Sequence, residues 1–98
     1  MNKDKFTEDP LRYALNLAYA QAMSGKGKER HAGNKPFDEQ IWTTITKACG
    51  LGFPVGQAMK KNEEATRLPK EAAVKELLGG IVYLSMAVIT LLDEKEGK

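Results

Sequence analysis

The residues of this chain that could do chemistry gather in one glycine-rich segment, residues 24–37, with the sequence SGKGKERHAGNKPF. It holds four permanent cations, which are Lys26, Lys28, Arg30 and Lys35. Glycine allows backbone N–H groups to point into a common cavity, and lysine and arginine donate charge-assisted hydrogen bonds to phosphate. The segment therefore predicts a binding site for an anionic ligand, and the alternative is a solvated surface loop.

Three further side chains of this segment could contribute to the same site. His31, the only histidine, could act as a general base or stack on a nucleobase, although a lone histidine in a polar loop is more often simply solvated. Asn34 adds hydrogen-bonding groups, and Phe37 could stack on a base. The spacing of a Walker A loop is absent, so the pattern indicates an anion without identifying it.

A second cluster of polar residues is the next candidate if the glycine-rich segment is only a linker. Its members are Gln57, Lys60 and Lys61. Lysine can pair with a phosphate as a point charge, and the amide of glutamine can donate hydrogen bonds. These three residues are therefore secondary ligand candidates.

No arrangement of residues in the sequence indicates catalysis or a bound metal. Small all-helical nucleotide pyrophosphohydrolases hold magnesium with Glu-x-x-Glu on one helix and Glu-x-x-Asp on the next. Here Arg67 follows Glu64 by three residues and Gly79 follows Glu76, so that spacing is absent. Cys49 is the only cysteine, which excludes an intramolecular disulfide and a cysteine-based metal site. These observations favour binding over catalysis, and no catalytic residue, metal or cofactor is assigned.

Length and charge limit the kinds of partner that we expect. Ninety-eight residues predict one domain, 1–98, with a modest core. The formal net charge of +2 is too small to indicate general binding to nucleic acid, whereas residues 24–36 set four cations against Glu29 alone, an excess of +3. Residues 1–5 lack the apolar core of a signal peptide, so we expect a reduced, cytoplasmic setting.

The hydrophobic pattern predicts an all-α fold, a small four-helix domain with helices near 9–23, 38–49, 54–67 and 69–93. Asp9 and Pro10 are suited to the start of the first helix, and Gly50 to the end of the second. Pro54 and Pro69 mark the starts of the other two. The remaining parts are an N-terminal arm (1–8), the basic segment (24–37) and a frayed tail (94–98).

The same pattern predicts which side of the middle helices is buried. In the second helix one side carries Ile41, Trp42, Ile45 and Ala48. In the third, Val55, Ala58 and Met59 are expected to point inward, while the charged residues Lys60, Lys61, Glu63, Glu64 and Arg67 lie largely in solvent.

The last helix contains 16 consecutive uncharged residues, Leu77–Leu92. This run is shorter than the roughly 20 residues that span a bilayer, so a buried helix is preferred over a membrane span. Because its second half is apolar on nearly every side, we expect a second copy of the chain to cover part of it, giving a homo-oligomer. Glycine costs about 1 kcal/mol relative to alanine inside a helix, so Gly79 and Gly80 predict the close approach of another helix.

The chain resembles a group of small phage and prophage proteins over about residues 10–92. The resemblance is carried by GKGKERH, by KPFDEQ and by LGFPVGQAMKKNEEATRLPKEAAVKELLGGIVYL. It implies a viral origin, a helical fold and, for a phage protein, the cytoplasm of the host cell, and it carries over no catalytic residue. The last helix, KELLGGIVYLSMAVITLL, is also similar to the closing helix of the MazG-like pyrophosphohydrolases.

Three functions follow from these observations. The leading hypothesis is a non-catalytic protein that holds a phosphate-bearing nucleotide, such as a signalling nucleotide of host antiviral defence, because small phage proteins that sequester such signals have a similar size and oligomeric design. The second is a divergent magnesium-dependent nucleoside triphosphate pyrophosphohydrolase, which requires four carboxylates to converge: Glu39, Glu64, Glu71 and Glu76. The third is a protein-interaction inhibitor of a host defence enzyme.

Overall fold

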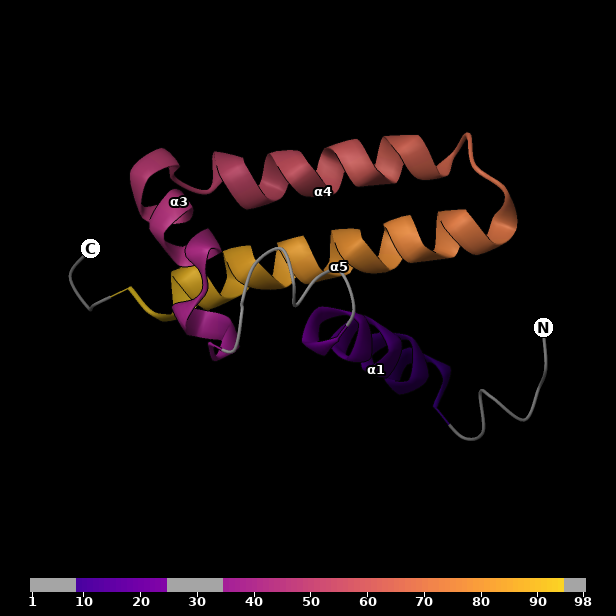
Figure 1. The fold of residues 1–98 in the computed structure, drawn as a ribbon, viewed down its shortest axis with the longest axis horizontal. Coiled ribbons are helices and arrows are strands. Elements are labelled where there is room, and N and C mark those ends of the chain that lie inside the picture. The colour runs from indigo at the N-terminus through magenta and orange to yellow at the C-terminus, as the bar shows by residue number, and fades with distance from the viewer. Residues whose placement is uncertain (1–8, 25–34, 95–98) are drawn as a thin grey trace.

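The fold is helical throughout the part of the chain that the structure, a computed structural model, describes, residues 9–24 and 35–94 (Figure 1). The elements are α1 (Pro10–Met23), the short 3-10 helix η2 (Phe37–Glu39), α3 (Ile41–Cys49), α4 (Gly52–Ala65) and α5 (Lys70–Leu92). Over these residues no strand is present. The predicted all-α fold class with four helices is confirmed, and the helix bounds differ from the predicted ones by a few residues.

The first helix begins where its sequence predicts. Pro10 is its first residue, and the carboxylate of Asp9 accepts a hydrogen bond from the backbone N–H of Arg12 at 3.0 Å. This bond satisfies one of the donors that the first turn of a helix leaves without a partner. At the other end, the hydroxyl of Ser24 donates to the carbonyl of Ala20 at 2.7 Å.

The second predicted helix, 38–49, is divided in two. Phe37–Glu39 forms the single turn of η2, and the α-helix starts only at Ile41. Between them Gln40 is extended, with φ −80° and ψ 169°. Its side chain is buried, at 5% exposure, and its amide donates to the carbonyl of Lys35 at 3.3 Å. This bond to a preceding residue accompanies the extended backbone that separates η2 from α3.

A glycine turn joins α3 to α4, as predicted. Gly50 has φ +77°, a backbone conformation that favours glycine, and its N–H donates to the carbonyl of Thr46 at 2.7 Å. The next helix begins at Gly52, two residues before the predicted start. Pro54 therefore lies within the first turn of α4, where its missing N–H costs no helical hydrogen bond.

The helices α4 and α5 form an antiparallel hairpin (Figure 1). At their contact a Cβ added to Gly79 would lie 2.9 Å from Cδ of Lys61, and one added to Gly80 would lie 2.7 Å from Oδ1 of Asn62. The predicted close approach of another helix to these glycines is confirmed. The approaching helix is α4 of the same chain, so the glycine pair does not itself indicate a second copy.

The core is small and lies where α3, α4 and α5 meet. Its most buried residues include Trp42 at 1% exposure and Ala58 and Met86 at 2% each. Trp42 and Ala58 are thus buried as predicted, but Ile41, Ala48 and Met59 are exposed, which contradicts their predicted place on the buried side. Successive residues of a helix are rotated by about 100°, so a neighbour of a fully buried side chain turns away from the same core.

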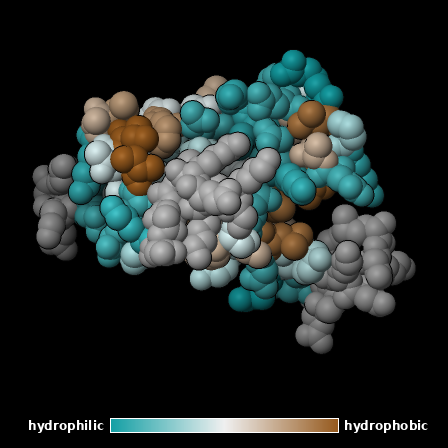
Figure 2. Space-filling view, in the orientation of Figure 1, coloured by the Kyte–Doolittle hydropathy of each residue, from teal (hydrophilic) through white to brown (hydrophobic). Residues whose placement is uncertain are grey.

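The first helix packs on the other side of α5, so that α5 lies between α4 and α1 (Figure 1). Ala18 of α1 is 3% exposed, and the amide of Gln21 donates to the carbonyl of Lys75 at 3.1 Å. By length and composition α5 could also cross a membrane, and of its most apolar 18 residues 22% are buried within the chain. The face seen in Figure 2 is largely hydrophilic, with separate apolar patches.

Candidate functional site

The predicted ligand segment is only partly described by the structure. Lys26, Lys28, Arg30, His31 and Asn34 lie outside the described residues. The two described candidates of the segment are at its C-terminal end, where Lys35 is exposed and Phe37 is half-buried.

Phe37 is held against a buried tryptophan. The ring centroids of Phe37 and Trp42 are 5.4 Å apart, and the ring planes are inclined by 46°. The indole N–H of Trp42 also donates to the carbonyl of Phe37 at 2.7 Å. Because Trp42 is almost completely buried, both contacts tie Phe37 to the core through α3.

Lys35 is fixed through its backbone while its side chain stays in solvent. Its carbonyl accepts the hydrogen bond from the buried amide of Gln40, and its residue surface is exposed. Together, Gln40 and Trp42 anchor residues 35–37 to the start of α3. An exposed cation thus lies two residues from a half-buried aromatic ring, at the end of the basic segment.

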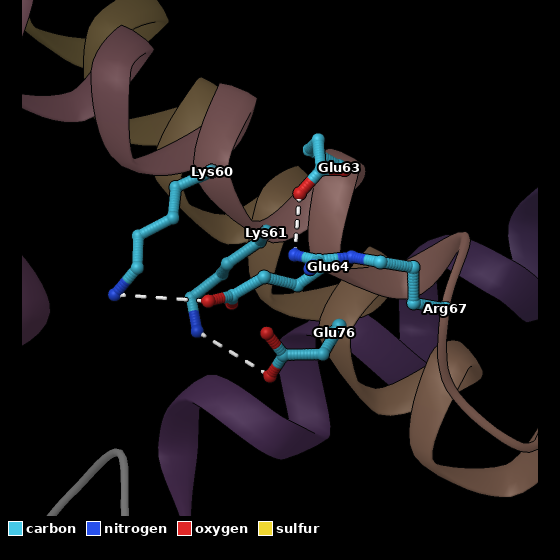
Figure 3. A network of polar contacts seen from close by, with 6 residues as sticks. All are labelled: Lys60, Lys61, Glu63, Glu64, Arg67 and Glu76. Carbon is cyan, nitrogen blue, oxygen red and sulfur yellow. Dashed lines mark hydrogen bonds and ion pairs between the residues drawn. The ribbon is translucent and has the colours of Figure 1, made fainter.

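The secondary candidates Gln57, Lys60 and Lys61 all lie on α4, and the structure pairs both lysines with carboxylates (Figure 3). Nζ of Lys60 is 3.9 Å from the carboxylate of Glu64 one turn away. Nζ of Lys61 is 3.7 Å from the carboxylate of Glu76 on α5. Gln57 is half-buried. The positive charge of this cluster is therefore largely balanced by its own neighbours.

The environment of Lys61 differs from the predicted one, in which its side chain lies largely in solvent. Its side chain, 24% exposed, crosses Gly79 at the contact between α4 and α5, and its Nζ is 5.8 Å from the ring centroid of Tyr83. An ion pair and a cation–π contact thus hold it in the helix interface. In the sequence, the acid Glu76 and the side-chain-free Gly79 mark a place on α5 that could receive a lysine. Which residue of α4 lies opposite them depends on how the two helices are aligned.

A third ion pair joins the end of α4 to the turn that follows it. The guanidinium of Arg67 is 2.6 Å from the carboxylate of Glu63, and both side chains are about two thirds exposed (Figure 3). Pairs so exposed contribute little to stability, because water screens their attraction. They do, however, lower the net charge that this surface presents to a ligand.

The four carboxylates that magnesium chemistry would require are not brought together. Glu64 and Glu76 each face a lysine, and Glu39 and Glu71 lie on η2 and on the first turn of α5. Within residues 9–24 and 35–94, no group of three or more histidine, cysteine, aspartate or glutamate residues could hold a metal ion. Cys49 is an exposed free thiol.

Comparisons with known proteins do not extend these observations. The chain matches no protein-family model, no curated protein and no solved structure. The candidate site therefore rests on the residues and contacts described above.

Proposed function

We propose that this protein binds a phosphate-bearing nucleotide without converting it, and that the basic segment, residues 24–37, forms the binding site. The observation that carries the proposal is the distribution of unbalanced positive charge. The segment has an excess of +3, with four cations and the single acid Glu29. By contrast, the cations Lys60 and Lys61 of α4, and Arg67 in the turn that follows it, each have a carboxylate partner.

The anchored end of the segment supports a nucleotide over a bare anion. A nucleotide offers phosphate for charge-assisted hydrogen bonds and a flat base for stacking. Lys35 and Phe37 present these two kinds of group close together, and the contacts of Gln40 and Trp42 fix their backbone. None of the ion pairs among the described residues uses Lys35.

The placement of the acids favours binding without turnover, since Glu64 is paired with Lys60 and Glu76 with Lys61. The resemblance to phage proteins extends the proposal to a host signalling nucleotide that the protein sequesters in the host cytoplasm. We also propose that the protein acts as a homo-oligomer through Leu77–Leu92, with no membrane insertion. The large exposed apolar residues of α5 support this form.

A capture experiment tests the proposed function. Purified protein is incubated with a panel of mono-, cyclic and triphosphate nucleotides plus magnesium, then recovered, denatured and analysed for the released compound. Release of an intact nucleotide is the expected result. A magnesium-dependent product would instead identify a pyrophosphohydrolase, and failure to retain any nucleotide would overturn the proposal.

The variant Lys26→Ala/Lys28→Ala/Arg30→Ala should lose capture. Lys47→Ala is the matched control, because Lys47 is an exposed lysine on α3 outside the segment. Equal capture by both variants would exclude the basic segment as the site.

A further inference from the structure

One line of apolar residues on α5 is spaced alternately by three and four positions. We call this line the α5 seam, and it consists of Val74, Leu77, Ile81, Leu84, Val88 and Leu91. Such spacing is the heptad pattern of two helices that pack along their length. From the first to the last of these residues the helix rises about 26 Å.

The seam is a side of α5 that the described residues, 9–24 and 35–94, leave partly uncovered. Five of its residues are between 41% and 53% exposed, and Ile81 is half-buried. The buried residues of the same helix are Gly79, Gly80, Met86 and Ala87, which follow a different line. The glycines among them face α4. Among the described residues, the seam is therefore open to a partner.

We infer that this partner is the same seam of a second copy, with the two α5 helices parallel. The residue types carry this inference. The three positions equivalent to heptad position a are β-branched, namely Val74, Ile81 and Val88. The three equivalent to position d are leucines. β-Branched residues at a with leucine at d favour a parallel, two-stranded arrangement. The inference rests on the self-association proposed above and specifies its face, its stoichiometry and its direction.

The positions flanking the seam are compatible with an identical partner. Charged residues at heptad positions e and g normally select a partner by attraction or repulsion. Here those positions between 73 and 92 are uncharged: Ala73, Leu78, Gly80, Ser85, Ala87 and Leu92. At these positions α5 therefore carries no charge that would repel a second copy or select an oppositely charged protein.

The surroundings of α5 favour a protein partner over a lipid bilayer. The side of α5 that contacts α4 includes Glu76, which is paired with Lys61. The side chains of Lys60 on α4 and of Arg67 in the turn after α4 are each 67% exposed. Charged groups are costly at the depth of the hydrocarbon core, so only the seam side of α5 matches an apolar environment.

Cysteine cross-linking tests the direction of pairing. In a Cys49→Ser background the variants Leu77→Cys and Leu91→Cys should each form a disulfide-linked dimer under mild oxidation, because equal positions meet in a parallel pair. Met59→Cys is the control, since Met59 is 67% exposed but lies on α4. Cross-linking only in a mixture of the Val74→Cys and Leu91→Cys chains would show antiparallel helices and would overturn the inference.

Measuring the oligomeric state of variants tests whether the α5 seam is the face that pairs. Sedimentation should show a dimer of the full-length chain, and Leu84→Glu should weaken dimerisation at least about tenfold, because it places a charge in an apolar interface. Met59→Glu should leave the dimer unchanged. If Leu84→Glu loses helical circular dichroism, the cross-linking variants decide the question instead.

The possible failures are distinguishable. A monomer at all concentrations would overturn both the seam and the proposed self-association. A dimer that Leu84→Glu does not weaken would overturn the seam alone, and binding of the wild-type chain to phosphatidylcholine vesicles without dimerisation would favour a membrane. Nucleotide capture, measured separately, tests the proposed ligand function.

Discussion

Lys61 of α4 lies across Gly79 of α5, so closely that a Cβ on the glycine would come within 2.9 Å of the lysine Cδ. The absence of a side chain at position 79 gives the lysine stem its path to Glu76. A helix-destabilising residue is thus tolerated in the middle of α5 because of a contact made by another helix.

The first prediction is that substitutions at these two positions are coupled. In a Lys61→Ala background, Gly79→Ala should stabilise the protein by about 1 kcal/mol, because alanine is the better helix former and the space is vacant. In the native background the gain should be smaller, since Lys61 must move. The free energies of unfolding in urea, followed by circular dichroism, provide this double-mutant cycle. Equal effects of Gly79→Ala in the two backgrounds would refute the coupling.

The second prediction concerns the ligand segment. Lys28→Ala or Arg30→Ala should weaken nucleotide binding about tenfold or more, because a hydrogen bond to a charged group is worth roughly 1.5–3 kcal/mol. Stability should change by less than about 0.5 kcal/mol if these side chains are solvated. Titration calorimetry and urea unfolding measure the two effects, with Lys47→Ala as control. If neither variant alters binding, Gln57, Lys60 and Lys61 become the next candidates.

The third prediction concerns the anchor of that segment. Trp42→Phe removes the donor to the carbonyl of Phe37 and leaves a smaller ring in a fully buried site. We expect a loss of about 1–3 kcal/mol in the free energy of unfolding. Circular dichroism in urea gives this value. A change below about 0.5 kcal/mol, typical of exposed surface positions, would mean that the anchor is unimportant.

The fourth prediction concerns the start of α1. Asp9→Ala removes the acceptor for the N–H of Arg12 and should cost about 0.5–2 kcal/mol. Asp9→Asn is the matched control, because asparagine caps a helix equally well and should have a much smaller effect. Similar losses in the two variants would point to the charge of Asp9 instead of its hydrogen bond.

Features determined by neighbouring residues could be predicted from the sequence. Asp9 and Pro10 mark the start of α1, and Gly50 ends α3, because a side-chain cap and a positive φ are local properties. The break at Gln40 could not be predicted, since it is associated with the burial of an amide that reaches back to Lys35. The exposure of Met59 also depends on which side of α4 meets the rest of the chain.

The candidate site was less predictable than the fold. The excess charge of residues 24–36 is visible in the sequence, but the pairing of Lys61 with Glu76 depends on the alignment of two helices. The three-and-four spacing of the α5 seam is likewise present in the sequence. The sequence does not show which side of α5 meets α4, and it is this packing on other residues of α5 that leaves Leu84 and Val88 exposed.

The contact between Phe37 and Trp42 gives the molecule an intrinsic optical reporter. Trp42 is the only tryptophan, so all of the indole fluorescence of the protein arises from one residue. Its ring contacts Phe37, and its N–H is bonded to the carbonyl of the same residue, at the C-terminal end of the proposed ligand segment. A ligand that shifts Phe37 should therefore change the emission of Trp42, which allows binding to be followed in the unlabelled protein.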